Sequence, residues 1–258
     1  MKTIYLKITI LILFIAPCSH SFAQSTYYDL YLCNTGTAIL KPALDPTLGP
    51  AISTNDIIKW KSKNVATGVE TPYPDQLGST PNLAITNAIV SALATGVHNF
   101  TVTVTYANGG CVGLESDAVT IYKLPTIALA FDNATPGSYC TNSTPLTGIT
   151  ATVTSTVPPG IGFTYTWSAE KSVNSGAYGS VALNTVGADN GSNTATSTFG
   201  MTATDVAAYR LTAKAKYFKL TGNSGDLRGD ATLCEQTSSN TKIVNVLPRP
   251  AKPSIAIE

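Results

Sequence analysis

The chain has 258 residues, of which 12% are charged and 43% hydrophobic, and its formal net charge is +1. This composition is typical of a globular, β-rich protein with uncharged polar surfaces, and it excludes a largely disordered chain. Lysine and arginine form no basic patch, so nothing supports nucleic-acid binding.

The amino terminus has the pattern of an export signal. A basic start is followed by an apolar run over 8–16 and by a small-x-small cleavage pattern that ends at Ala23. A bilayer-spanning helix needs about 20 apolar residues, so this shorter run predicts a cleaved signal peptide over 1–23. Cys18 leaves lipidation as a rival, although Pro17 stands where lipoprotein sites have a small residue. We expect a mature chain that does not span a membrane and is secreted or held at the cell surface.

The mature chain contains an internal repeat. Four landmarks recur in the same order, first as Cys33, Trp60, Cys111 and Leu124-Pro125 and then as Cys140, Trp167, Cys234 and Leu247-Pro248. In both copies the tryptophan follows the first cysteine by 27 residues, and the leucine follows the second cysteine by 13. The repeat predicts two tandem domains, here called the first unit (24–124) and the second unit (125–247).

Two further segments stand out beside the repeat. The second unit is longer mainly after Tyr217, where 218–230 is rich in Gly, Asn and Asp, and this predicts an elongated hairpin loop. The Pro-rich tail 248–258 predicts a stiff linker. Its end, Ser254-Ile255-Ala256-Ile257, is similar to the start of the second unit. We therefore expect a third repeat to begin there and the sequence to be a fragment of a longer protein.

Alternating apolar and polar residues predict strands around the landmarks. The alternation is clearest in the strand that precedes each second cysteine, and it aligns Phe100 with Tyr209. Trp60 and Trp167 alternate with lysine or threonine, so both are expected in a core. No segment has a convincing helical period, and 84–94 comes nearest. The pattern predicts an all-β fold.

A cysteine, a core tryptophan and a second cysteine among short strands resemble the immunoglobulin-like β-sandwich. Asp205-x-Ala207-x-Tyr209 is similar to its tyrosine corner, although Leu211 stands where an antibody domain has a cysteine. Asn108-Gly109-Gly110-Cys111 and the Leu-Pro steps are closer to the Ig-like and polycystic-kidney-disease-like (PKD-like) repeats of secreted Bacteroidota proteins. This resemblance covers 25–258 and implies two tandem immunoglobulin-like β-sandwich domains.

Four mature cysteines in an exported chain predict disulfides, with three possible connectivities. The repeat favours one bridge within each unit, Cys33 to Cys111 and Cys140 to Cys234. A metal site is disfavoured because there is no C-x-x-C spacing and His98 is the only histidine after cleavage. Pairing would also remove every cysteine nucleophile, and a Ser-His-Asp triad would have to use His98. We predict no catalytic residue, no metal and no cofactor.

The inserted segment offers a speculative ligand loop with Asp226, Arg228 and Asp230. Arg228-Gly229-Asp230 is the triplet found in integrin ligands, although chance explains it in a loop of this composition. The acidic groups could also hold Ca²⁺, but their spacing is not that of an EF-hand.

The function that fits best is a non-catalytic extracellular module, a spacer or adhesin-type segment of a larger secreted or surface protein. The alternative is a polysaccharide-binding module that uses aromatic side chains not assigned to a core: Tyr27, Tyr28, Tyr31, Tyr73 and Phe218. The sequence leaves the partner unknown, with an extracellular glycan or a surface protein as the two kinds that suit such a module.

Overall fold

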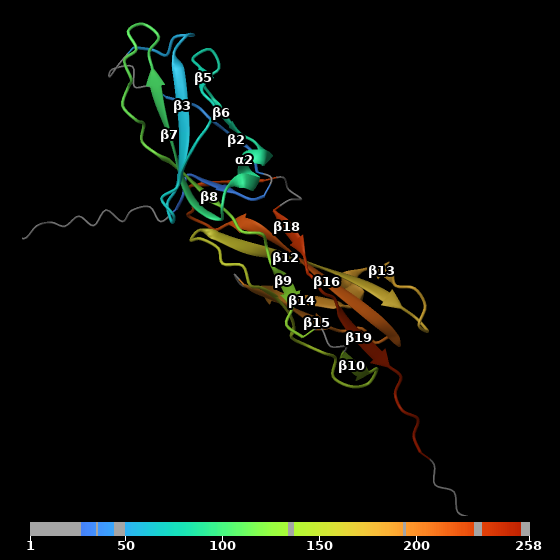
Figure 1. Cartoon of the computed structure of the whole chain (residues 1–258). Coiled ribbons are helices and arrows are strands. Elements are labelled where there is room, and N and C mark those ends of the chain that lie inside the picture. The colour runs from blue at the N-terminus through green and yellow to red at the C-terminus, as the bar shows by residue number, and fades with distance from the viewer. Residues whose placement is uncertain are drawn as a thin grey trace, which may run out of the picture.

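The computed structural model describes residues 27–34, 36–43, 50–133, 137–192, 195–229 and 234–253. The predicted signal peptide and residues 254–258 lie outside this range. Figure 1 shows an elongated molecule with the first unit at one end and the second at the other, whose regular secondary structure is almost wholly strand.

The first unit has a large sheet and a small one. The large sheet has the order β17-β1-β8-β7-β3-β4, and β5 also pairs with β3. Its strands are β1 (Leu30–Leu32), β3 (Ile57–Asn64), β4 (Glu70–Pro72), β5 (Gln76–Leu77), β7 (Gly96–Thr105), β8 (Val119–Lys123) and β17 (Asp226–Arg228). The small sheet consists of β2 (Ala38–Leu40) and β6 (Leu83–Ile85). One strand of the large sheet, β17, comes from the second unit.

A short helix, α2 (Asn87–Ala92), lies where the sequence showed its nearest approach to a helical period. The side chain of Thr86 caps it by accepting a hydrogen bond from the backbone N–H of Ile89. Val90 is its buried residue. The capping side chain and one apolar anchor support six helical residues in an otherwise β-structured unit.

The second unit has two sheets of more equal size. The larger has the order β10-β19-β16-β12-β13, with β18 also paired to β16, and the other has the order β14-β15-β11-β9. The strands of the larger sheet are β10 (Gly137–Cys140), β12 (Ile161–Ser172), β13 (Gly179–Val181), β16 (Ala207–Lys219), β18 (Glu235–Thr237) and β19 (Lys242–Leu247). The other sheet contains β9 (Leu129–Phe131), β11 (Ile149–Val153), β14 (Gly187–Ser192) and β15 (Thr196–Met201), and the 3₁₀ turn η1 (Leu183–Thr185) precedes β14.

The two units share both strand order and register. The order β1-β8-β7-β3-β4 in the first unit matches β10-β19-β16-β12-β13 in the second. In the first unit, Leu32 lies opposite Lys123 in a parallel pair. In the second, Tyr139 lies opposite Val246, and all four residues directly precede a repeat landmark. Two antiparallel-rich sheets in this order form an immunoglobulin-like β-sandwich, so the all-β immunoglobulin-like prediction is confirmed.

The register corrects one detail of the sequence alignment. Ile121 and Val244 each precede the leucine of a Leu-Pro step by three residues, and they lie opposite His98 and Tyr209. Tyr209 therefore corresponds to His98, and the alignment of Tyr209 with Phe100 was wrong by two residues. A shift of two keeps every side chain on the same face of the strand, which is why alternation alone could not detect it.

The tyrosine-corner contact expected of Tyr209 is made by other residues. The buried His98 places its Nε2 2.8 Å from the carbonyl oxygen of Ala94, which joins the start of β7 to the preceding turn. In the second unit, the Tyr139 hydroxyl donates to the Ala203 carbonyl at 2.5 Å. Tyr209 instead lies beside Lys171, whose Nζ is 5.9 Å from the ring centroid.

Each unit has its own buried cluster, and the tryptophans lie within them. Trp60, Trp167, Phe100 and Tyr209 are all buried. The indole of Trp60 donates to the Pro81 carbonyl at 2.9 Å, whereas that of Trp167 donates to the Ser197 hydroxyl at 2.9 Å. A satisfied N–H lets each indole fill a core at no polar cost.

Candidate functional site

The candidate site is the joint between the two units, where a strand pair and a disulfide connect them. Figure 1 shows the two units joined at the middle of the molecule, between the label of β8 and that of β18. Here the segment expected to be a hairpin loop forms strand β17 and pairs with the first unit. Its residues Asp226, Leu227 and Arg228 lie opposite Leu30, Tyr31 and Leu32 of β1 in parallel register. The insertion therefore completes the sheet of the neighbouring unit.

Backbone hydrogen bonds extend this pairing at both ends. The N–H of Asp226 donates to the Asp29 carbonyl at 3.0 Å, and the N–H of Cys33 donates to the Arg228 carbonyl at 3.2 Å. The approach is so close that a Cβ on Gly225 would lie 2.0 Å from the Tyr28 carbonyl oxygen. Only glycine fits there without moving the backbone.

A disulfide also joins the two units, between Cys33 directly after β1 and Cys234 six residues after the end of β17. Cys33 is bonded to Cys234, with a Cα–Cα distance of 5.6 Å. A Cβ on Gly229 would lie 2.0 Å from the sulfur of Cys33 and 2.2 Å from that of Cys234. The glycine of the Arg-Gly-Asp triplet is thus explained by its packing against the bridge.

The expected pairings of one bridge within each unit are wrong. Cys33 directly follows Leu32, which lies opposite Lys123 of β8, and Lys123 in turn lies opposite Gly96 at the start of β7. The Cys111 carbonyl instead accepts a hydrogen bond from the Tyr106 N–H, just past the other end of β7. Ten strand residues separate these points, about 33 Å. A disulfide needs Cα atoms within about 7 Å, so Cys33 cannot reach Cys111.

The same geometry separates Cys140 from Cys234. Cys140 lies opposite Leu247, next to the pair of Val246 and Ala207 at the start of β16. The Cys234 carbonyl instead accepts from the Tyr217 N–H near the end of β16. Cys111 is an exposed free thiol and Cys140 a half-buried one.

An aromatic cluster fills the joint. Tyr31 is fully buried within the hydrophobic cluster of the second unit, and its hydroxyl donates to the Pro159 carbonyl at 3.1 Å. The ring centroids of Tyr28 lie 5.7 Å from Tyr31 and 5.1 Å from Tyr122. The Tyr217 hydroxyl donates to the Pro125 carbonyl at 2.8 Å, and burial raises the pKa of Tyr217. Tyr31 thus anchors the first unit in the core of the second, and the Tyr217 bond holds the start of the second unit against β16.

Polar side chains lie beside the cluster, and the contact of Asn34 with Thr126 crosses between the units. The Asn34 amide donates to the Thr126 hydroxyl at 2.9 Å, and its carbonyl accepts from the Lys123 ammonium at 2.7 Å. Burial lowers the pKa of Lys123, because an apolar environment disfavours the charged form. Asn223, also buried, donates to the Gly160 carbonyl at 2.8 Å and accepts from the Gly225 N–H. The inserted segment is therefore fixed at its turn as well as along its strand.

A groove of about 900 Å³ opens beside the joint, between the β1–β17 edge and the β2–β6 sheet. Asp226 and Arg228 of the speculative ligand loop lie on its wall. Their exposed side chains form an ion pair of 3.0 Å, and Asp29 accepts from the Thr120 N–H at 2.6 Å. Asp230, the third residue of the proposed loop, lies outside the described residues.

The aromatics considered for sugar binding are mostly committed to packing. Tyr31 is fully buried, and the Tyr73 ring stacks on Phe100 with centroids 5.8 Å apart. Tyr27 and Tyr28 are half-buried, and Phe218 is exposed on β16. None of the five lines the groove.

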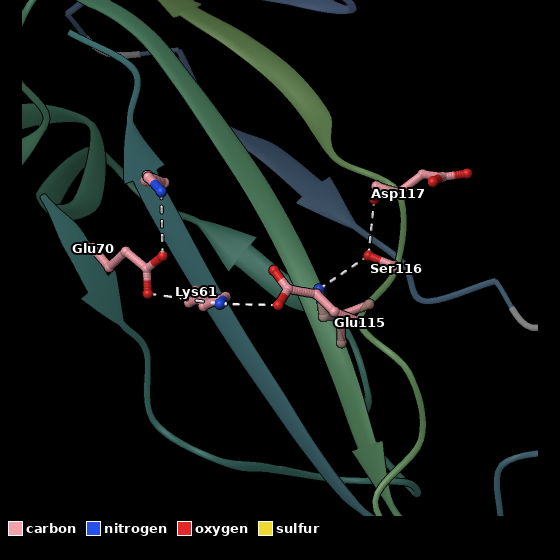
Figure 2. A network of polar contacts seen from close by, with 7 residues as sticks. Lys61, Glu70, Glu115, Ser116 and Asp117 are labelled. Atoms are coloured by element: carbon pink, nitrogen blue, oxygen red, sulfur yellow. Dashed lines mark hydrogen bonds and ion pairs between the residues drawn. The ribbon is translucent and has the colours of Figure 1, made fainter. Parts of the chain in front are cut away.

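A charged network lies on the other edge of the first unit (Figure 2). Lys61 on β3 stands between two carboxylates, with Nζ 3.0 Å from Glu115 and 3.6 Å from Glu70. Hydrogen bonds from Thr101 and Lys61 lower the pKa of Glu115, and the bond to Glu115 raises the pKa of Lys61. A general acid needs a raised carboxyl pKa, so this pair has the opposite tuning.

The network fixes the segment that follows the free Cys111 thiol. The Ser116 N–H donates to the Val102 carbonyl at 3.0 Å, and the Ser116 hydroxyl donates to the Asp117 carbonyl at 2.9 Å, as Figure 2 shows. Within the described ranges, no three His, Cys, Asp or Glu side chains gather as a metal site would require.

No protein-family model matches the chain, and no curated protein is similar to it in sequence. Solved structures resemble it at low identity. Three N-terminal domains of the bacteriophage RB49 outer capsid protein Hoc match 84% of this chain and 67% of theirs, at 9% identity and a TM-score of 0.40. The fibronectin(III)-like modules of Clostridium thermocellum CbhA match 91% of this chain and 98% of theirs, at 9% identity and 0.30.

A titin I-band fragment, I67–I69, matches 87% of this chain and 64% of its own length, at 10% identity and a TM-score of 0.35. All three are tandem modules of the immunoglobulin or fibronectin kind or are described as serial domains. Scores this low carry no argument about function, and the fold class stated above rests on the strand order.

Among the described helices, none has the length and apolarity to cross a membrane.

Proposed function

We propose that the chain is a non-catalytic extracellular module made of two immunoglobulin-like domains, one per unit. More particularly, it serves as a stiff spacer or adhesin-type segment of a secreted or surface protein. The observation that carries this proposal is the joint, where β17 and the Cys33–Cys234 bridge bind the two units. A disulfide of this kind persists in oxidising compartments, which supports export.

Stiffness follows from the number of independent restraints across the joint. A flexible linker would allow the units to move separately, but here a strand pair, a covalent bond and the buried Tyr31 all have to break first. A rigid rod keeps a terminal domain away from the surface it is attached to. This task needs no pocket and no catalytic group.

The test is ¹⁵N relaxation of the labelled chain with its disulfide intact. A stiff spacer gives one shared rotational correlation time for amides of both units. A Cys234→Ser, Tyr31→Ala variant, which keeps only the β17–β1 pair of the three restraints, is the control, and the correlation times of its two units should differ more than those of the unaltered chain. Two different correlation times in the unaltered chain would refute the stiff-spacer role.

The alternative of polysaccharide binding now rests on the groove rather than on aromatic side chains. Its wall carries the Asp226–Arg228 pair and the backbone of β17, which offer hydrogen bonds to hydroxyl groups. Affinity electrophoresis against a panel of glycans tests it. Retardation that Arg228→Ala abolishes would favour this function, and unchanged mobility with every glycan would remove it.

The PKD-like relationship and a Bacteroidota source remain part of this proposal. They rest on the glycine-cysteine hairpin of the first unit and on the Leu-Pro steps of both units.

A further inference from the structure

Each half of the inter-unit disulfide has a structural counterpart at the far end of the molecule. Cys33 and Cys140 occupy the same place in their units, because each follows a strand of matching register. Each also begins the same turn. The Gly36 N–H donates to the Cys33 carbonyl at 2.8 Å, and the Ser143 N–H donates to the Cys140 carbonyl at 2.9 Å.

Cys111 and Cys234 correspond in the same way. Each carbonyl accepts a hydrogen bond from a tyrosine N–H at the end of the long strand, Tyr106 at 2.9 Å and Tyr217 at 3.2 Å. Each lies 13 residues before a Leu-Pro step. The disulfide thus joins Cys33, which follows a strand of the first unit, to Cys234, which lies at the hairpin of the second. Cys140 is the free counterpart of Cys33, and Cys111 is the free counterpart of Cys234.

The surface beside Cys140 is uncovered where its counterpart is covered. Leu124, which opens the first Leu-Pro step, is 0% exposed because the second unit packs over it, whereas Leu247 of the second step is 45% exposed. Leu247 lies directly opposite Cys140 in the strand pair. An apolar side chain is therefore exposed beside a free thiol.

The opposite pole of the molecule presents complementary groups. Cys111 is exposed on a hairpin bent by two glycines with positive φ, Gly109 and Gly110. Two apolar residues follow it closely, with Val112 68% and Leu114 97% exposed. We call these two surfaces the Cys140 pole (Cys140 and Leu247) and the Cys111 pole (Cys111, Val112 and Leu114). Each combines a free thiol with exposed apolar side chains.

We propose that the Cys140 pole of one chain binds the Cys111 pole of a second copy and forms a disulfide with it. Both thiols lose their protons as the sulfur–sulfur bond forms. The two electrons reduce a small-molecule disulfide such as oxidised glutathione to two thiols. The contact is head-to-tail, so it leaves a free pole at each end and extends into linear chains. It adds a second kind of joint to the proposed spacer, but it does not depend on that role.

The experiment uses the full chain with Cys33–Cys234 intact, incubated in a glutathione redox buffer and resolved without reductant. The expected result is a ladder of oligomers that reductant collapses, with Cys140 linked to Cys111 in peptide maps. Cys111→Ser alone and Cys140→Ser alone should stay monomeric, because each variant keeps only one type of pole. Mixed together, they should give heterodimers and nothing longer.

A second measurement separates specific docking from random thiol chemistry. Leu247→Ser and Leu114→Ser keep both cysteines and change exposed side chains, so the fold should be retained. Each should slow cross-linking about tenfold, since an apolar contact is lost, while alkylation of the thiols by iodoacetamide keeps its rate. Dimers of Cys140→Ser alone would overturn the proposal. So would a monomer whose Cys111 and Cys140 both stay free, the result expected if these poles are covered by something other than a second copy.

Discussion

The two units share one strand order but close their sandwiches to different degrees. The smaller sheet of the first unit consists of two three-residue strands, whereas its counterpart in the second unit has four strands. The first unit also contributes Tyr31 and Leu124 to the hydrophobic cluster of the second and receives β17 in return. The difference indicates that the first unit depends on the second for part of its stability, and that the second is closer to self-sufficient.

The largest effect is expected from removing the bridge between the units. The Cys33→Ser, Cys234→Ser variant loses a cross-link that spans 201 residues, which the chain-entropy model values at about 5 kcal/mol. If the first unit is the dependent one, its transition in urea should move much further than that of the second. Cys111→Ser, Cys140→Ser is the control and should unfold like the unaltered chain. Equal shifts of both transitions would contradict the comparison.

Removal of the aromatic anchor comes next. Tyr31→Ala empties a fully buried site in the second unit's cluster and should cost about 3–5 kcal/mol in the free energy of unfolding. Tyr31→Phe loses the two hydrogen bonds of the hydroxyl, which donates to the Pro159 carbonyl and accepts from the Tyr28 N–H, and this should cost about 1–2 kcal/mol. Chemical denaturation of both variants measures the difference. Similar losses in the two would mean that the hydroxyl, not the ring, holds the joint.

Two tyrosines of the second unit form a matched pair. The Tyr217 hydroxyl donates to the carbonyl of Pro125, the first residue of the second unit, so Tyr217→Phe should cost about 1 kcal/mol. The buried Tyr165 hydroxyl has no hydrogen-bond partner among the described residues, and burial raises the pKa of Tyr165 to about 12. Tyr165→Phe should therefore be neutral or slightly stabilising. A loss from Tyr165→Phe equal to that from Tyr217→Phe would show that the unpaired hydroxyl matters after all.

Acid should distinguish the units as well. Asp56 accepts hydrogen bonds from the N–H groups of Ala107 at 2.9 Å and Ser53 at 2.7 Å, and these bonds lower its pKa. A carboxyl with a lowered folded pKa stabilises the protein above its unfolded pKa, about 4. That stability is lost as the pH falls through the folded pKa. The melting temperature of the first unit should fall when the pH is lowered below about 4. The Asp56→Asn variant should have a lower melting temperature at pH 7, and that temperature should change less with pH. An unchanged acid profile in Asp56→Asn would exclude this role.

The smallest effect is expected from the network in Figure 2. The side chains of Lys61 and its two carboxylates are 35–48% exposed, and ion pairs near the surface contribute little. Lys61→Met should change the melting temperature by about 1 °C or less. A larger loss, insensitive to salt, would give this edge of the first unit a stabilising role that the comparison does not assign to it.

The sequence predicted the fold better than the joint. Alternation and the tryptophan spacing identify strands and cores, because a buried face imposes a period of two on any strand. The repeat also predicted matching units, but it suggested that equal spacing means a bridge within each unit. A repeated cysteine pair fits bridges between successive units equally well. The choice depends on which strand ends meet in space, and neither Cys33 nor Cys234 carries that information locally.

One feature of the sequence could have indicated the joint. The extra residues of the second unit lie where β17 forms, and Gly225 and Gly229 mark the two closest approaches. Composition indicated a loop there because glycine and asparagine favour turns. Pairing with β1 decides otherwise, since an open strand edge offers hydrogen bonds to any extended segment that reaches it.

The pairing of β17 with β1 has a consequence for the order in which the chain folds. Leu30 finds its partner Asp226 only after nearly the whole second unit has been made. A chain is synthesised amino terminus first, so β1 keeps one unpaired edge until then, and closing so long a loop is slow. During that interval the exposed edge can pair with another chain. A shortened product that ends before residue 226 should therefore aggregate even though every strand of β1, β3, β7 and β8 is present.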